Sequence, residues 1–230
     1  MSSLVRSDKF SAFGSPAAAS RSQGGGMQTR EAVTTASVLA RGTVPQVRAV
    51  VVRLGRRAWV APAGPGWVLV LPERPQVADP LDPFDLLGLG RGLTDHGIRK
   101  ALLLSVRRGL GVAQLLVPRQ ESSFVGWRGE ESGHPAASRA QPGAVGFCRQ
   151  IGVPERAELL ELLLEDVSGS PEERLGDLCR ALGLTTAGLG ATADDLADER
   201  VHLPGVERLH RHGWLRRRAG TLRLRRRTAQ

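Results

Sequence analysis

Arginines are concentrated at the C-terminal end of this sequence. Residues 200–230 contain ten arginines and one acid, Glu207, which gives the segment a formal charge of +9. A guanidinium group is planar and binds phosphate or carboxylate oxygens through parallel N–H donors. We therefore expect an anionic partner to contact a set of these side chains: Arg208, Arg211, Arg216, Arg217, Arg218, Arg223 and Arg225.

The rest of the chain is neutral as a whole but not uniform. The full sequence also carries a net charge of +9, from 32 bases and 23 acids, so residues 1–199 hold 22 of each. Within them, residues 155–199 carry twelve acids and three arginines, a net charge of −9. The basic end can neutralise the phosphates of a nucleic acid, or it can pair with this acidic block within one chain or between the subunits of a homodimer. Both interpretations stay open.

Patterns that would indicate an enzyme are weak. The segment 88–92 contains G-x-G, but Leu93 stands where a dinucleotide-binding loop needs its third glycine. Asp95 and His96 are adjacent, and adjacent side chains rarely face one another as an acid–base pair. We therefore expect a non-enzymatic protein without a cofactor.

A metal site is not expected either. His202, His210 and His212 lie near Glu207, but helical positions i and i+2 diverge, and the neighbouring arginines oppose a cation. The two cysteines are thirty-one residues apart with no C-x-x-C, which favours free buried thiols in a reducing cytoplasm. No apolar run reaches the roughly 18 residues of a membrane span.

The first half of the chain predicts a small antiparallel sheet. Residues 1–45 are rich in Ser, Ala, Gly and Arg, which is typical of a disordered leader. Residues 46–128 contain short apolar, β-branched runs between Gly and Pro, which predict strands and hairpins. We expect strands at 47–54, 57–61, 67–71, 101–106, 112–117 and 124–128, with one helix at 84–90.

The second half predicts helices. Residues 129–150 are polar with Gly and Pro, and we interpret them as a linker between two domains. In 151–227 the apolar period becomes helical, which predicts helices at 155–167, 170–183, 192–199 and 204–212. Ser170, Pro171 and Glu173 form a capping-box signature for the second of these. Residues 214–225 alternate Leu and Arg after Ala219-Gly220, which predicts a basic β-hairpin. A frayed, solvated terminus is the alternative.

The helices closed by a basic hairpin resemble a winged helix-turn-helix DNA-binding domain. Residues 175–184 (LGDLCRALGL) are similar to the second helix and turn of that family, and residues 209–224 (LHRHGWLRRRAGTLRL) to its last helix end, strand and wing. About thirty residues separate Gly183 from Gly213, more than the family usually has. The resemblance implies DNA binding through the hairpin arginines.

The sequence thus predicts a cytoplasmic α+β protein with a small antiparallel-sheet domain followed by a helical domain that ends in a basic β-hairpin. The first functional hypothesis is a non-enzymatic DNA-binding protein of the transcriptional-regulator type, in which the sheet domain senses or forms a homodimer. The alternative is a protein-interaction module, immunity- or adaptor-like, that uses its acidic helix or its sheet for contact.

Overall fold

β1 (Val33–Arg41) lies near the centre of an eight-stranded antiparallel sheet, with β3 on one side and β4 on the other. The computed structural model describes residues 33–74, 84–107, 109–129, 137–166 and 168–210. Across the sheet the strand order is β7-β6-β5-β4-β1-β3-β2-β8. The other strands are β2 (Ala58–Pro62), β3 (Trp67–Pro72), β4 (Ala101–Arg107), β5 (Leu110–Leu116), β6 (Ser123–Arg128), β7 (Ala137–Gln141) and β8 (Glu207–Leu209).

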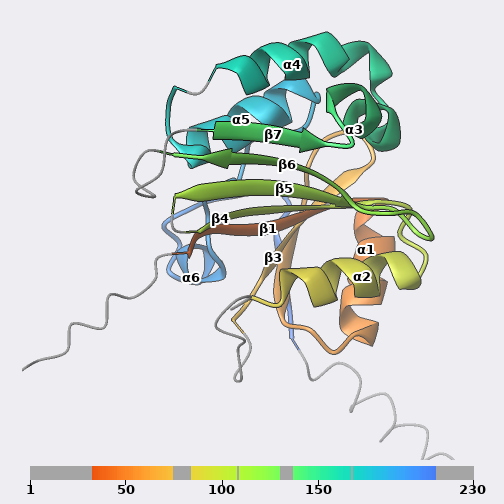
Figure 1. Cartoon of the computed structure of the whole chain (residues 1–230). Helices are drawn as coiled ribbons and strands as arrows, with labels where there is room; N and C mark the ends of the chain where they lie inside the picture. Colours follow the sequence, from red (N-terminus) through yellow and green to blue (C-terminus); the bar gives the residue numbers. More distant parts are fainter. Residues whose placement is uncertain (1–32, 75–83, 108, 130–136, 167, 211–230) are drawn as a thin grey trace, which may run out of the picture. The chain divides into compact units, whose positions relative to one another are not determined.

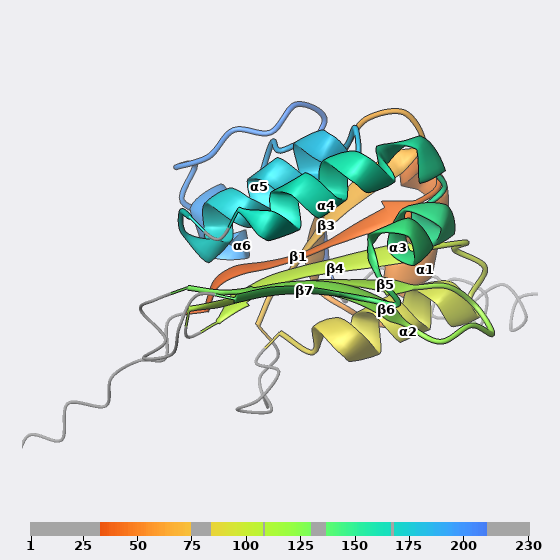
Figure 2. The ribbon, with the colours of Figure 1, turned by 45° about the horizontal axis from the view of Figure 1, so that its top comes forward.

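Helices cover both faces of this sheet (Figure 1). One face carries α1 (Val44–Arg53) and α2 (Leu86–Asp95). The opposite face carries α3 (Ala144–Ile151), α4 (Ala157–Glu165), α5 (Pro171–Ala181) and α6 (Ala193–Ala197), with a short 3-10 helix, η2 (Pro154–Arg156), before α4. Figure 2 shows these two helical layers above and below the strands.

Two apolar cores result, one on each side of the sheet. Alternate residues of β1 separate them: Leu39 belongs to the core under α3–α6, and Val38 to the core under α1 and α2. Successive side chains of a strand point to opposite faces, and a strand buried on both faces must therefore be apolar or small throughout. In β1 the residues from Thr35 to Ala40 are all buried.

The predicted α+β class is confirmed, but the predicted order of a sheet domain followed by a helical domain is not. β8 comes from the far end of the described chain and pairs with β2, so the same sheet contains residues from 33 to 209. The helices α3–α6 pack on that sheet and share one core with it. This arrangement needs long-range strand pairing, which local sequence patterns do not reveal.

Several predicted segments differ in the structure. The leader 1–45 was expected to be disordered, but its residues 33–41 form β1. The strand expected at 47–54 is helix α1, because Val47, Val50 and Val51 at helical spacing bury one stripe against the sheet. The helix expected at 84–90 starts and ends later, as α2.

The second half needs corrections too. The linker expected at 129–150 contains β7 and α3, both of which pack on the sheet. The helix expected at 204–212 is wrong: residues 207–209 form β8. The hairpin expected at 214–225 lies outside the described residues. Strands β2–β6 and the capping box of α5 are confirmed within a few residues of their predicted bounds.

Candidate nucleic-acid interface

Arg208 is the one predicted contact residue that falls in the described part of the chain. It lies on β8, where its Nε donates a hydrogen bond to Glu73 Oε1 at 2.8 Å. Its guanidinium carbon stands 5.2 Å from the centre of the Trp59 ring, a cation–π distance. Arg208 is therefore held on the surface of the sheet. The remaining six, Arg211, Arg216, Arg217, Arg218, Arg223 and Arg225, lie outside the described residues.

The acid next to Arg208 is also paired. Glu207 Oε2 accepts a hydrogen bond from Arg48 Nη1 of α1 at 3.2 Å, and about half of each side chain is exposed. The two ion pairs of β8 thus neutralise its charges within the chain and fix this short edge strand to α1 and to the end of β3. At exposed positions such pairs stabilise only weakly.

The segment that resembles a helix-turn-helix, 175–184, forms most of α5 and the turn after it. Its apolar residues Leu175, Leu178 and Cys179 are buried on the sheet. Towards solvent, Asp177 and Arg180 form an ion pair one turn apart.

A second surface rich in arginine lies on the sheet itself, on the face that also carries α1 and α2. There, α2 covers the central strands through Leu103 of β4 and Leu116 of β5. In Figure 1 no helix crosses in front of β6 and β7. Directly paired residues of antiparallel strands share a face, and the register therefore identifies the side chains of this uncovered area. We call it the open sheet face: Ser105, Arg107, Leu110, Val112, Gln114, Phe124, Gly126, Arg128, Ala137, Arg139 and Gln141.

The burial of alternate residues shows that the described elements cover this face less than the other. In β6, Ser123, Val125 and Trp127 are buried under α3–α6, whereas Phe124 and Gly126 are partly exposed and Arg128 is exposed. A Cβ placed on Gly126 would meet only one atom within 4 Å, the backbone oxygen of Gly111 at 3.6 Å. Among the described residues, no side chain therefore lies within 4 Å of this position on the open sheet face.

The chemistry of the open sheet face is cationic. It carries Arg107, Arg128 and Arg139, one on each of β4, β6 and β7. None of the described residues of β4–β7 that share this face is acidic. Phe124 lies between Gln114 and Gln141 in the row of paired residues that crosses β5, β6 and β7. Guanidinium groups around a partly exposed aromatic ring can bind phosphates and stack a base.

The two cysteines of the chain are buried free thiols. Burial, and then the negative charges of Glu155 and Glu161, raise the pKa of Cys148 to about 11. Burial raises the pKa of Cys179 to about 12, so both are protonated thiols at neutral pH. Within the described residues, no group of three or more His, Cys, Asp or Glu side chains is placed to hold a metal ion. No helix in that part of the chain is long and apolar enough to cross a bilayer.

A scan against protein-family models finds no match, and searches of curated proteins and of solved structures find none either.

The open sheet face was not among the sites that the sequence predicted. A usable signal was present in 123–128, where Ser-Phe-Val-Gly-Trp-Arg places Phe124, Gly126 and Arg128 on one face of a strand. Arg139 gave no such signal, because β7 (Ala-Ser-Arg-Ala-Gln) lacks an apolar alternation. Only the pairing of β6 with β7 brings these arginines onto one surface.

Proposed function

We propose that this is a non-enzymatic DNA-binding protein of the regulator type, and that a single-stranded stretch of DNA binds on the open sheet face. The observation that supports this most is the combination, on one face of the sheet, of two exposed arginines, Arg128 and Arg139, and a partly exposed Phe124, with no acid among the described residues of that face. Backbone phosphates supply most of the affinity in such complexes, and bases stack on aromatic rings.

Each side chain has a distinct part in this proposal. Arg128 and Arg139 are exposed and contact phosphates, with Arg107 extending the basic row onto β4. Phe124 stacks one base, and Gln114 and Gln141 beside it offer amide donors and acceptors to base edges. Because Gly126 has no side chain, the single-stranded DNA can approach the sheet surface closely at this position. The C-terminal arginines 211–225 add phosphate contacts, and in this proposal the protein acts in the cytoplasm.

The surface of a β-sheet is better suited to binding single-stranded DNA than duplex DNA. A sheet presents its side chains over an area rather than along a ridge, and single-stranded nucleic acid exposes both its bases and its phosphates to such a surface. A duplex has its bases stacked and offers Phe124 no ring to contact.

Fluorescence anisotropy with a labelled oligonucleotide, single-stranded or annealed, tests this function. We expect the single strand to bind, with log Kd rising linearly with log salt between about 50 and 200 mM, by about 0.7 per phosphate neutralised. Tighter binding of the duplex would assign the contact to the C-terminal arginines instead. No binding of either oligonucleotide at low salt would refute DNA binding.

A protein-interaction module is the second candidate, and α4 supports it. Its outer surface exposes 63% of Leu162 and 42% of Leu159, with Glu158, Glu161 and Glu165 around them. Large exposed apolar side chains with a charged rim are typical of protein contact surfaces. Such a partner would carry basic and apolar side chains.

A further inference from the structure

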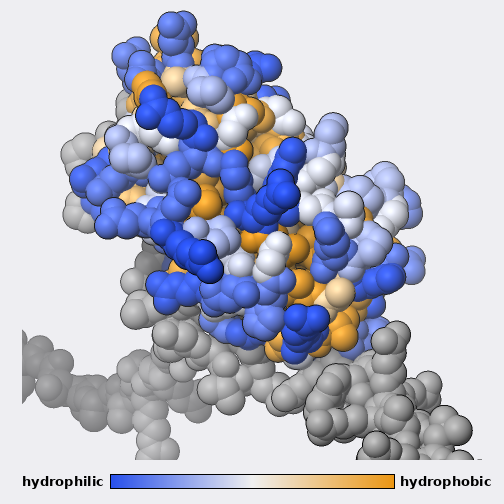
Figure 3. Space-filling view, turned by 90° about the vertical axis from the view of Figure 1, so that its right-hand side faces the viewer, coloured by the Kyte–Doolittle hydropathy of each residue, from blue (hydrophilic) through white to orange (hydrophobic). Residues whose placement is uncertain are grey.

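Two basic residues are neighbours at the end of the sheet where β1 stops. Arg41 is the last residue of β1, and Lys100 immediately precedes β4. The backbone N–H of Arg41 donates to the carbonyl oxygen of Lys100 at 2.8 Å, which keeps the two residues adjacent. Figure 3 views this end of the molecule and shows hydrophilic side chains between apolar patches.

Both side chains point to the face of the sheet that α3–α6 cover. Arg41 Nη1 donates to the carbonyl oxygen of Pro65 at 2.9 Å, and its guanidinium carbon lies 5.4 Å from the centre of the Trp67 ring. Lys100 Nζ donates to the carbonyl oxygen of Ile151, the last residue of α3, at 3.0 Å. These contacts fix the position of each cation but use only one N–H donor of each group.

Neither cation has an acidic partner among the described residues. The pKa of Lys100 is lowered, first by burial and then by the positive charge of Arg41. Arg41 is exposed and Lys100 is half-buried, and two like charges near each other destabilise both charged forms. An anion between them would remove this repulsion and accept the unused N–H donors.

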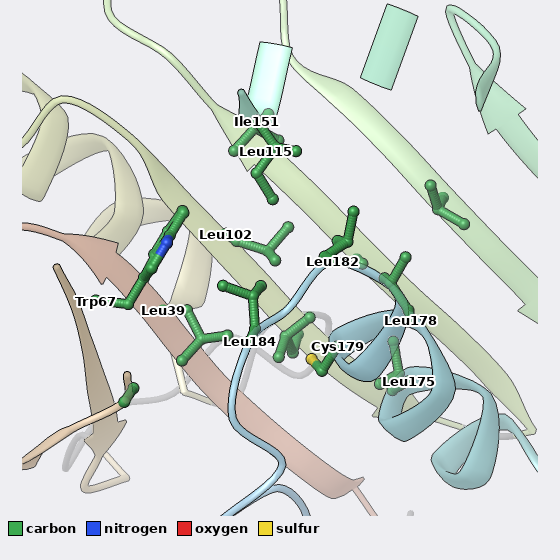
Figure 4. Close-up of a cluster of buried hydrophobic side chains, with 14 of the residues drawn as sticks. Leu39, Trp67, Leu102, Leu115, Ile151, Leu175, Leu178, Cys179, Leu182 and Leu184 are labelled. Atoms are coloured by element: carbon green, nitrogen blue, oxygen red, sulfur yellow. The ribbon is translucent and has the colours of Figure 1, made fainter. Parts of the chain in front are cut away.

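Two glycines make room for the cations. A Cβ on Gly66 would lie 3.2 Å from the guanidinium carbon of Arg41, and a Cβ on Gly152 would lie 3.3 Å from Lys100 Nζ. Both have positive φ, +71° and +101°, which glycine adopts without strain. Figure 4 shows Trp67 and Ile151, the residues that Arg41 and Lys100 contact, among the apolar side chains on this face of the sheet.

We propose that Arg41 and Lys100 form a binding site for the phosphate group of a small molecule. A phosphate monoester carries a charge of about −1.5 to −2 at neutral pH, which matches two cations. The site lies on the opposite face from the open sheet face and does not depend on the DNA-binding proposal. A DNA backbone offers a related group, the phosphodiester, with a single charge per phosphate, and the experiment separates the two.

The lysine content of the chain makes a direct test feasible. Lys100 and Lys9 are its only lysines, and 13C-labelled lysine therefore gives two side-chain signals, of which Lys9 is an internal control. On titration with inorganic phosphate or pyrophosphate in a constant chloride background, we expect the Lys100 signal to shift to saturation and its pKa to rise. The Lys9 signal should not move. Equal shifts of both signals, or none at millimolar phosphate, would overturn the proposal.

Calorimetric measurement of pyrophosphate binding by variants tests whether Arg41 and Lys100 form the site. Arg41→Gln and Lys100→Gln should each weaken pyrophosphate binding by about tenfold or more, since each removes a charged hydrogen bond. Arg53→Gln, an exposed change in the last turn of α1, should leave it unchanged. Arg41→Lys keeps the charge and controls for the packing of Arg41 on Trp67. If wild type binds DNA but not pyrophosphate, and Lys100→Gln weakens DNA binding, the small-molecule site is refuted and Lys100 belongs to the DNA contact.

Discussion

Gly126 of β6 is paired directly with Arg139 of β7, so this arginine of the edge strand lies beside a position that has no side chain of its own. On the opposite face of the neighbouring strand, β5, a glycine lies close to helix α5. There a Cβ on Gly111 would lie 3.0 Å from Cβ of Pro171 and 3.2 Å from its carbonyl oxygen. Replacing glycine by valine should therefore preserve or raise the stability of the fold at Gly126 and lower it at Gly111.

Gly126→Val should preserve or raise stability, by up to about 1 kcal/mol, because valine favours a strand and has room here. Gly111→Val should destabilise the fold by about 1 to 3 kcal/mol through overpacking. Urea denaturation midpoints of the two variants measure this difference. Gly126→Val should also weaken binding of single-stranded DNA by filling the open sheet face. If the Gly126→Val protein folds and binds single-stranded DNA with unchanged affinity, the DNA does not pass over this position.

Arg174 and Asp166 should make stability depend on acid pH. Arg174 Nη2 lies 2.7 Å from Asp166 Oδ1, and only 6% of the arginine side chain is exposed. The hydrogen bonds from Arg174 and Ser168 hold the pKa of Asp166 well below its usual range. In the unfolded chain that pKa is about 3.9. The contribution of this pair is therefore complete above about pH 5 and is lost progressively as the pH falls from there towards the folded-state pKa.

We expect Asp166→Asn to lower the thermal midpoint at neutral pH and to reduce its fall between about pH 5 and pH 3. Asp198→Asn is the control, since Asp198 pairs with an exposed arginine, Arg200. Parallel pH profiles for wild type and Asp166→Asn would contradict this account of the pair.

The cap of α5 should be measurable on its own. Ser170 Oγ accepts a hydrogen bond from the backbone N–H of Glu173 at 3.3 Å, and Glu173 Oε2 accepts one from the N–H of Ser170 at 2.8 Å. Ser170→Ala should cost about 1 kcal/mol in the free energy of unfolding, because an amide of the first turn loses its acceptor. Ser122→Ala provides the comparison, since Ser122 is exposed and its Oγ accepts a hydrogen bond from the Gln114 side chain rather than from a helix amide. Equal denaturant midpoints for Ser170→Ala and wild type would mean that the cap does not stabilise α5.

We expect the fold to require β1 but not the first 26 residues of the chain. Deleting residues 1–26 leaves all described elements intact, and we expect an unchanged melting temperature. Deleting residues 1–41 removes a strand that is hydrogen-bonded to β3 and β4, and should abolish cooperative unfolding. Differential scanning calorimetry of the two truncations checks this. A drop of several degrees with the shorter deletion would contradict the first expectation.

Local signals predicted those elements that local interactions determine. The hairpin of β4 and β5 follows from two apolar runs around Gly109, and α5 from Ser170 and Pro171 at its start. The valine run of α1 shows the limit of such signals. Its β-branched residues favour a strand, yet Thr43, Pro45 and the packing of Val47 against the sheet produce a helix. Tertiary contacts decided between the two.

The candidate site was harder to predict from the sequence than the helices and strands. Charge counting located the C-terminal arginines, because they are contiguous in the chain. The open sheet face is assembled from β4, β6 and β7, whose arginines are up to thirty-two residues apart, from Arg107 to Arg139. β8 was missed for the same reason, since three residues become a strand only by pairing with β2.

The salt dependence of single-stranded DNA binding in an Arg128→Gln/Arg139→Gln variant tests the central claim most directly. Both arginines are exposed, so the variant should fold like wild type. We predict weaker binding and a log–log salt slope smaller by about 1.4, or about 0.7 for each phosphate that the variant no longer neutralises. Arg149→Gln on α3, on the other face of the sheet, should leave the slope unchanged. Replacing Arg216, Arg217 and Arg218 with alanine measures the C-terminal contribution separately. An unchanged slope and affinity in the Arg128→Gln/Arg139→Gln variant would show that the open sheet face is not the DNA interface.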